Sequence, residues 1–137
     1  MKRRQSGQAL VEWAVVSFVL LLLGLGILAL GQIVGAYMAI RSASSQAAFA
    51  AARAPSEKEA QGQGHRAALQ AVAGSSIEDF SLTVDTHGFQ RGGVVTVSAQ
   101  GQLSLANYPI VRQVLGERMK LSWTSNALIE PYRSRAP

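Results

Sequence analysis

The sequence predicts an α+β protein in which a long N-terminal helix, membrane-spanning in its first half, precedes a small domain with a short helix and an antiparallel sheet of about three strands. Two observations support this prediction. Residues 13–30 are uncharged and almost wholly apolar, whereas apolar and polar residues alternate after Gly74. Alternation of this kind is typical of half-buried strands. A chain of 137 residues has room for one modest domain beside such a helix.

Composition and charge exclude several classes of function. The net charge is +5, but without Lys2, Arg3 and Arg4 only 10 basic residues face 8 acidic ones. The remaining basic residues are scattered and have no interleaved aromatic platform, so we expect no nucleic-acid partner. The chain has no cysteine, which excludes disulfides, thiolate metal sites and cysteine nucleophiles but leaves the cellular compartment open.

The apolar run has the length of a membrane-spanning helix. Such a helix needs about 20 mostly apolar residues, whereas a secretory signal peptide has an apolar region of about 7 to 15. A basic cluster precedes the run and the next charge is Arg41. The positive-inside rule therefore predicts a single-pass protein of the inner (cytoplasmic) membrane, with a cytoplasmic N-terminus and an extracytoplasmic C-terminal domain. A signal peptide cleaved after the "ALG" of residues 29–31 remains an alternative.

Glu12 stands at the start of the apolar run, where a plain anchor has no use for a carboxylate. An ionisable group at membrane depth costs about 2.5 to 3.5 kcal/mol, and less near the interface. A signal peptide would gain nothing from it either. We therefore expect another group to compensate the charge of Glu12.

The residues around Glu12 form a motif. A basic leader, residues 1–7, ends in Gly7 and is followed by Gln8, with Glu12 and Trp13 shortly after, in the stretch "GQALVEWAVV". This pattern resembles the site cut by prepilin peptidases, and it is similar to TadE-like pseudopilins of the tight adherence (Flp) pilus. Tyrosine or phenylalanine is more usual in the family at the position of Trp13.

The resemblance implies cleavage between Gly7 and Gln8. The new α-amino group of Gln8 and the carboxylate of Glu12 could then offset each other's desolvation, within one subunit or between neighbours. It also implies a minor pseudopilin that works by assembly, with neither catalysis nor a cofactor. The implied partners are the prepilin peptidase, other pilins or pseudopilins, the inner-membrane assembly machinery and the lipid bilayer.

Two other functions remain open at this point. A pseudopilin of a type II secretion system would use the same processing motif. A signal-anchored periplasmic binding domain would need only the apolar run, and Glu12 would then be incidental. Whether the subunit enters the pilus also stays open.

The helical pattern continues past the membrane. Residues 8–53 contain no proline and become rich in alanine, the best helix former, so we expect one helix of about 69 Å. Small residues recur at steps of four along it, and such a strip lets another helix approach closely. The strip serves either another subunit or the chain's own domain; its first four members are Gly31, Gly35, Ala39 and Ala43.

Residues 55–137 form the predicted extracytoplasmic domain. Pro55 ends the long helix, and Ser56 with Glu59 has the form of a capping box that opens a second helix. We expect that helix to end at Gly74 and to cover the apolar face of the sheet. The predicted strands centre on Phe80–Val84, Val95–Ala99 with its continuation to Leu105, and Met119–Ala127.

Two connections join these strands. "THGFQRGG", residues 86–93, is rich in turn formers and predicts a hairpin loop. "NYPIVRQVLG", residues 107–116, places Pro109 at a helix start, with Val111, Val114 and Leu115 as a short apolar face.

We identify no catalytic or metal site in the sequence. His65 and His87 lack partners at metal-binding or catalytic spacing, so we interpret both as surface residues. Glu57 and Glu59 are explained by their position at a helix start. The pair at 78–79, Glu78 and Asp79, is interpreted as a solvated turn just before the first strand.

Overall fold

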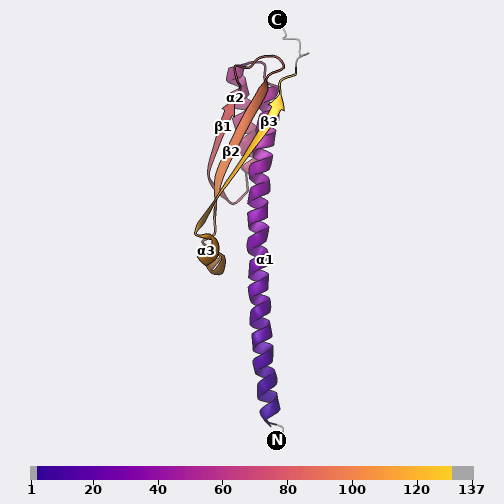
Figure 1. The fold of residues 1–137 in the computed structure, drawn as a ribbon, viewed down its shortest axis with the longest axis vertical. Helices are drawn as coiled ribbons and strands as arrows, with labels where there is room; N and C mark the ends of the chain where they lie inside the picture. The colour runs from indigo at the N-terminus through magenta and orange to yellow at the C-terminus, as the bar shows by residue number, and fades with distance from the viewer. Residues whose placement is uncertain (1–2, 131–137) are drawn as a thin grey trace.

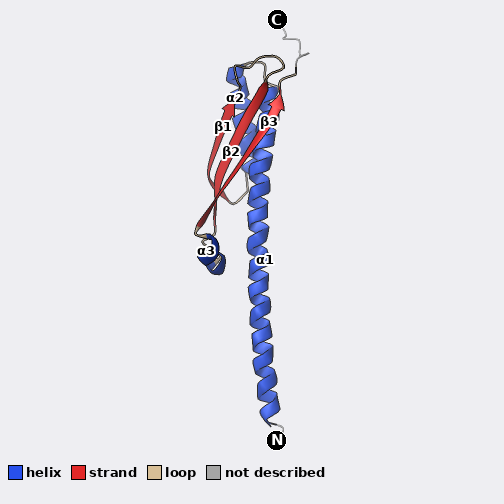
Figure 2. Cartoon of the chain, in the orientation of Figure 1, coloured by secondary structure: helices blue, strands red, loops and turns tan. Residues whose placement is uncertain are grey.

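A computed structural model describes residues 3–130 of the chain, with side chains from residue 7 onward. A long N-terminal helix precedes a small domain with a short helix and a three-stranded antiparallel sheet (Figures 1 and 2), which confirms the predicted fold class. The elements in chain order are α1 (Arg3–Ala52), α2 (Glu57–Val72), β1 (Ile77–Asp85), β2 (Val94–Ser104), α3 (Pro109–Leu115) and β3 (Arg118–Leu128).

Helix α1 is a single column of 50 residues, which corresponds to about 75 Å. Its leucines and alanines favour helix, and no proline occurs before Pro55. Pro55 disfavours the helical conformation at Ala54, and the Ala54 N–H donates to the Ala51 carbonyl at 3.2 Å to close the last turn. The domain packs on the C-terminal half of α1, while the N-terminal half stands alone (Figure 1).

The three strands lie in the order β1-β2-β3, with β2 in the centre and both pairings antiparallel. In this register Val97 stands opposite Val84 on one side and Ser125 on the other. Val95, Val97 and Leu103 are fully buried, and their polar neighbours along the strand face outward. The predicted alternation is therefore present in β2 and sets its inner face.

The sheet is covered mainly by α1 rather than by the second helix, contrary to the sequence prediction. The C-terminal half of α1 packs on β2 and β3, and α2 packs beside α1 near the β1 edge. The buried face of α1 is almost entirely alanine, so the sheet can approach the helix axis closely. The buried residues of α1 are Ala29, Ala36, Ile40, Ala43, Ser44, Ala47, Ala48, Ala51 and Ala52.

Polar and aromatic contacts fix α1 to the sheet. The Ser44 hydroxyl donates to the Val97 carbonyl at 2.8 Å, inside the core. The rings of Tyr37 and Trp123 meet edge to face, with centroids 5.5 Å apart. The Arg41 guanidinium lies 5.3 Å from the centroid of the same Trp123 ring. These contacts set the height of the sheet along α1.

Helix α2 begins and ends as the sequence predicts. The Ser56 hydroxyl accepts from the Glu59 N–H at 3.4 Å, which satisfies one of the free donors of the first turn. Gly74 adopts a positive φ of 78° just after the last turn, a conformation that glycine adopts without strain. The helix runs without a break through Gly62 and Gly64.

The interpretation of Glu78 and Asp79 as a turn before the strand was wrong. Both lie within β1, where the register against β2 shifts between Glu78 and Ser81 and Asp79 has a φ of 50°. This irregularity is a β-bulge, which takes up an extra residue so that Ile77 and Phe80 both face the core. Both Ile77 and Phe80 pack against buried core residues.

Two glycines occupy places where no larger residue fits without displacement. A Cβ added to Gly101 would collide with Ile77 Cγ2 and lie 3.0 Å from Ile40 Cδ1. A Cβ added to Gly64 would lie 3.3 Å from the Ala47 carbonyl oxygen. The first glycine sets the approach of β2 to α1, and the second sets the approach of α2 to α1.

We predict that a fragment of residues 55–137 does not fold cooperatively, because it lacks the helix that covers its sheet. A fragment of residues 29–137 keeps the alanine face and should show a cooperative thermal transition by circular dichroism. A cooperative transition of the shorter fragment with native-like spectra would contradict the dependence of the core on α1.

We predict that Gly101→Ala lowers the free energy of unfolding of the 29–137 fragment by about 1 to 3 kcal/mol, as overpacking does. Gly62→Ala is the matched control: its added Cβ comes no closer than 3.8 Å to another residue, and alanine within a helix contributes about 0.5 to 1 kcal/mol of stability. Thermal or urea denaturation measures both changes. Equal effects of the two substitutions would mean that Gly101 is not a point of close approach.

Candidate assembly surface on the long helix

The predicted processing motif lies on the first turns of α1. Gly7, Gln8, Glu12 and Trp13 are all exposed, and the helix runs unbroken through the bond between Gly7 and Gln8. The Gln8 side-chain amide donates to Glu12 Oε1 at 3.4 Å, one helical turn away. Among the side chains of residues 7–130, no ion pair reaches Glu12. The carboxylate therefore has a polar neighbour but no counter-charge among those residues.

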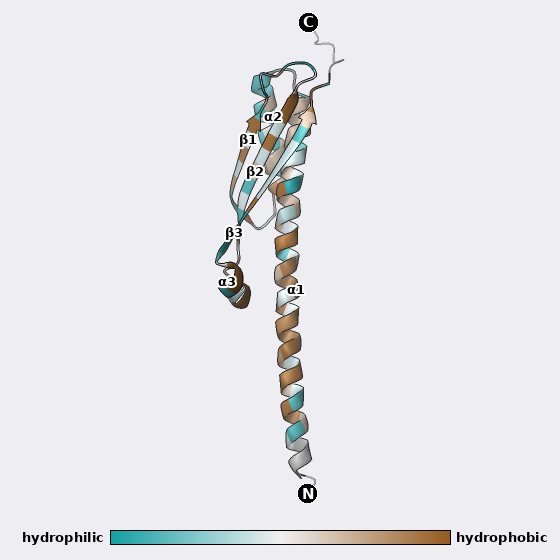
Figure 3. Ribbon diagram, viewed as in Figure 1, coloured by the Kyte–Doolittle hydropathy of each residue, from teal (hydrophilic) through white to brown (hydrophobic). Residues whose placement is uncertain are grey.

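The next segment of α1 is apolar on all sides. Of the large apolar side chains between Leu10 and Leu30, all but Leu22 are exposed. Figure 3 shows most of this part of α1 in brown, with only α3 of the domain beside its upper end. By length and composition the helix from Gly7 to Ala52 could cross a membrane. An apolar helix that buries so little of its surface in its own domain is consistent with a membrane anchor.

The strip of small residues does not lie on a single face. Gly31 and Gly35 are exposed, Ala39 is half-buried and Ala43 is buried in the domain core. A step of four residues turns about 40° beyond a full helical turn, so the strip winds around the helix. Its first two members thus lie away from the sheet, and its later members, Ala47 and Ala51 included, form the core.

A second spacing keeps small residues on the free side of α1. Ser17, Gly24 and Gly31 recur every seven residues, which drifts by only about 20° per step. A Cβ added to Gly24, Gly31 or Gly35 would meet nothing within 4 Å. Ser17 and Gly24 lie outside the predicted strip with steps of four and were not expected from the sequence. We call the set Ser17, Gly24, Gly31 and Gly35 the small-residue lane.

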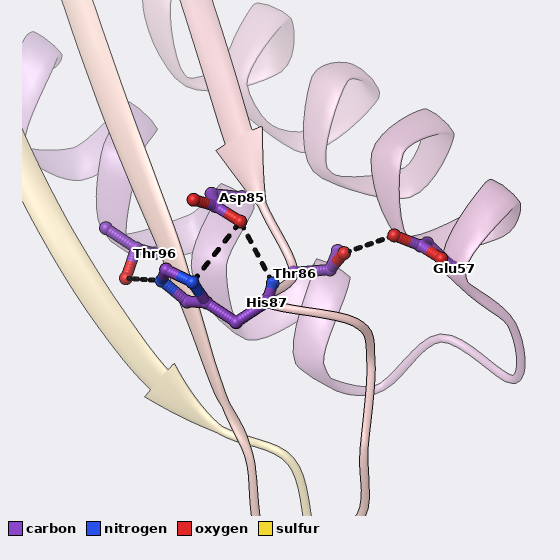
Figure 4. A network of polar contacts seen from close by, with 5 residues as sticks. All are labelled: Glu57, Asp85, Thr86, His87 and Thr96. Atoms are coloured by element: carbon purple, nitrogen blue, oxygen red, sulfur yellow. Dashed lines mark hydrogen bonds and ion pairs between the residues drawn. The ribbon is translucent and has the colours of Figure 1, made fainter.

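The far end of the domain holds the other candidate polar residues (Figure 4). The Thr86 hydroxyl donates to Glu57 Oε1 at 2.6 Å, which ties the hairpin loop to the start of α2. Asp85 Oδ1 accepts from the His87 backbone N–H at 2.9 Å and lies 3.6 Å from His87 Nδ1. His87 Nε2 lies 3.4 Å from the Thr96 hydroxyl.

These contacts hold the hairpin loop between β1 and β2 in place, and we see no catalytic arrangement among them. His65 is exposed on α2, away from this network. Within residues 3–130, no three histidine, aspartate or glutamate side chains gather in a way that could hold a metal ion. The candidate assembly surface is therefore sought on α1, at the predicted processing motif and along its exposed face.

Comparison with known protein families gives a match that lies within α1. The family model of TadE-like proteins matches residues 7–48. This match confirms the resemblance to TadE-like proteins over most of α1. No curated protein and no solved structure gives a significant match to the chain. Residues 49–137 lie outside the matched segment.

Proposed function

We propose that this chain, a TadE-like protein over residues 7–48, is a minor pseudopilin needed for assembly of a tight adherence pilus. In this role a prepilin peptidase removes residues 1–7, and the mature subunit acts as a structural component without catalysis. The observation that most favours the proposal is Glu12, a carboxylate that stands exposed at the start of an apolar helix without a counter-charge among the described side chains.

The physical argument concerns the cost of that carboxylate. In a membrane Glu12 is unfavourable by about 2.5 to 3.5 kcal/mol at full depth. Cleavage after Gly7 would create an α-amino group on Gln8, about 6 Å below Glu12 along the helix. The same amine on a neighbouring subunit could approach Glu12 directly, because the carboxylate is exposed. Pairing between subunits then converts an unfavourable group into a driving force for assembly.

The proposed topology follows from the charges at both ends of the apolar segment. The basic residues of the leader stay in the cytoplasm, and α1 crosses the inner membrane. The C-terminal half of α1 then holds the sheet and α2 on the extracytoplasmic side. Other pilins or pseudopilins would pack along the small-residue lane, where the absence of large side chains permits close helix contact.

We predict that the mature protein begins at Gln8 in cells that contain a prepilin peptidase. Intact-mass analysis should show loss of residues 1–7, and the same chain in cells without the peptidase should keep them. A start at Gln32 would instead indicate a signal peptide, and an unprocessed chain in both cell types would indicate a plain anchor.

We predict that Glu12→Leu separates insertion from assembly. The substitution removes a group that is unfavourable in lipid, so the protein should insert and be cleaved normally. It also leaves the Gln8 amine unpaired, and breaking a buried pair costs about 3 to 5 kcal/mol. A loss of about 3 kcal/mol lowers an association constant more than a hundredfold. Membrane fraction, mature mass and pilus yield measure the three steps separately.

Two further variants sharpen this test. Glu12→Gln keeps the size and polarity of the side chain and should lose pili as Glu12→Leu does, because the charge is what matters. Val16→Leu changes an exposed apolar residue one turn further along α1 and should assemble normally. Normal pili from Glu12→Leu would refute the proposed role of the carboxylate.

A further inference from the structure

Helix α3 presents an apolar face that the rest of the chain does not cover. Val114 is 79% exposed, Ile110 51% and Leu115 48%, and α3 contains no buried residue. The sequence predicted an apolar face from Val111, Val114 and Leu115, but only Val111 packs against the core. At 100° per residue these apolar side chains share one side of α3, while Arg112 and Gln113 lie on the other.

The position of α3 explains why an uncovered apolar face is tolerable there. Helix α3 lies at the end of the domain that is nearer the N-terminus of α1, beside the apolar part of that helix (Figure 3). An open cavity separates the two helices. It is lined by Leu22, Leu25 and Gly26 of α1 and by residues 108–111 of the connection and α3. Apart from Tyr108, the lining side chains are apolar.

The depth of this cavity can be compared with the membrane. The uncharged run of residues 13–30 is the part of α1 that spans the hydrocarbon core in the proposed topology, so the outer edge of the core lies near Leu30. Residues 22–26 lie about 6 to 12 Å inside that outer edge. Amphipathic helices that lie in a membrane interface bury their apolar face by about 5 to 10 Å. The depth of α3 overlaps this range.

The charges near α3 suit the headgroup region. Three basic side chains are exposed on or just after α3, Arg112, Arg118 and Lys120, against two acidic ones, Glu117 and Asp79. Arg118 also lies 3.8 Å from Asp79 across the exposed strand ends. A surplus of basic side chains above an apolar face favours contact with anionic lipids. Tyr108 at the start of α3 is a residue type enriched at membrane interfaces.

We propose that α3 is a second membrane contact of this protein, lying in the outer leaflet of the inner membrane with lipid acyl chains in the cavity between α3 and α1. The domain then touches the bilayer at two points, at α1 and at α3. This placement rests on the topology of the proposed function. The occupant of the exposed apolar face is lipid, and neither a second copy of the chain nor another protein is needed to cover it.

Single cysteines can test this contact because the chain has none of its own. The full-length protein carrying Val114→Cys is labelled with an environment-sensitive fluorophore and reconstituted into vesicles of phosphatidylethanolamine and phosphatidylglycerol. Acyl-chain-brominated lipid and aqueous iodide then serve as alternative quenchers. The Val114 probe should lose emission to brominated lipid and be largely protected from iodide, with blue-shifted emission. Ile110→Cys repeats the measurement at a second position of the same face.

Three control positions make the result interpretable. Leu128→Cys matches Val114 as an apolar residue that is 70% exposed, but it lies at the far end of β3 and should be quenched by iodide alone. Gln113→Cys on the polar side of α3 should be less sensitive to brominated lipid than Val114→Cys. Leu25→Cys, which lies within the proposed span and lines the cavity, should be quenched by brominated lipid.

The outcomes distinguish this inference from the function on which it rests. Iodide quenching of Val114→Cys equal to that of Leu128→Cys, with Leu25→Cys still quenched by lipid, would overturn the membrane contact of α3 alone. Protection of Val114→Cys from both quenchers would also overturn it, because protein would then cover the face. Failure of brominated lipid to quench Leu25→Cys would overturn the proposed span and the α3 contact together.

Discussion

The packing of the sheet on the alanine face of α1 is the contact on which the rest of the structure depends. One continuous helix meets two different environments. Its first half exposes large apolar side chains in all directions, and its second half buries small ones beneath β2 and β3. Alanine is suited to the second half, because it favours helix and allows the strands to approach the helix closely. The sheet therefore has no core that is separate from α1.

The polar contacts of the domain refine this packing rather than replace it. The hydrogen bond from Ser44 to Val97, the edge-to-face contact of Tyr37 with Trp123 and the position of Arg41 over the Trp123 ring fix the register between helix and sheet. At the far end, Glu57 and Asp85 hold the hairpin loop in place. These groups occur where the chain changes direction or where two elements cross.

Local patterns predicted most of the elements, whereas their mutual packing was not predictable from them. The alternation around Val97, the cap at Ser56 and the proline at 109 mark strands and helices through neighbouring residues alone. The choice of α1 over α2 as the main cover depends on contacts between residues more than fifty positions apart, such as Ser44 and Val97. The bulge at Asp79 also has no local signal, because it follows from the need to turn Ile77 inward. The motif of Gly7, Gln8, Glu12 and Trp13 stays a prediction, and it could be proposed from the sequence because its members lie within seven residues.

The unbroken course of α1 has a mechanical consequence. Helix α1 runs from Arg3 to Ala52 without interruption, and the domain is packed on its C-terminal half. The helix and the domain therefore move as one rigid body. In the proposed topology, a movement of α1 outward through the bilayer would displace the domain by the same distance, because no flexible segment separates them. The same movement would draw α3 away from the lipid surface that we propose it contacts. Extraction of the subunit and release of its domain would thus be a single movement, driven from whichever end the force is applied.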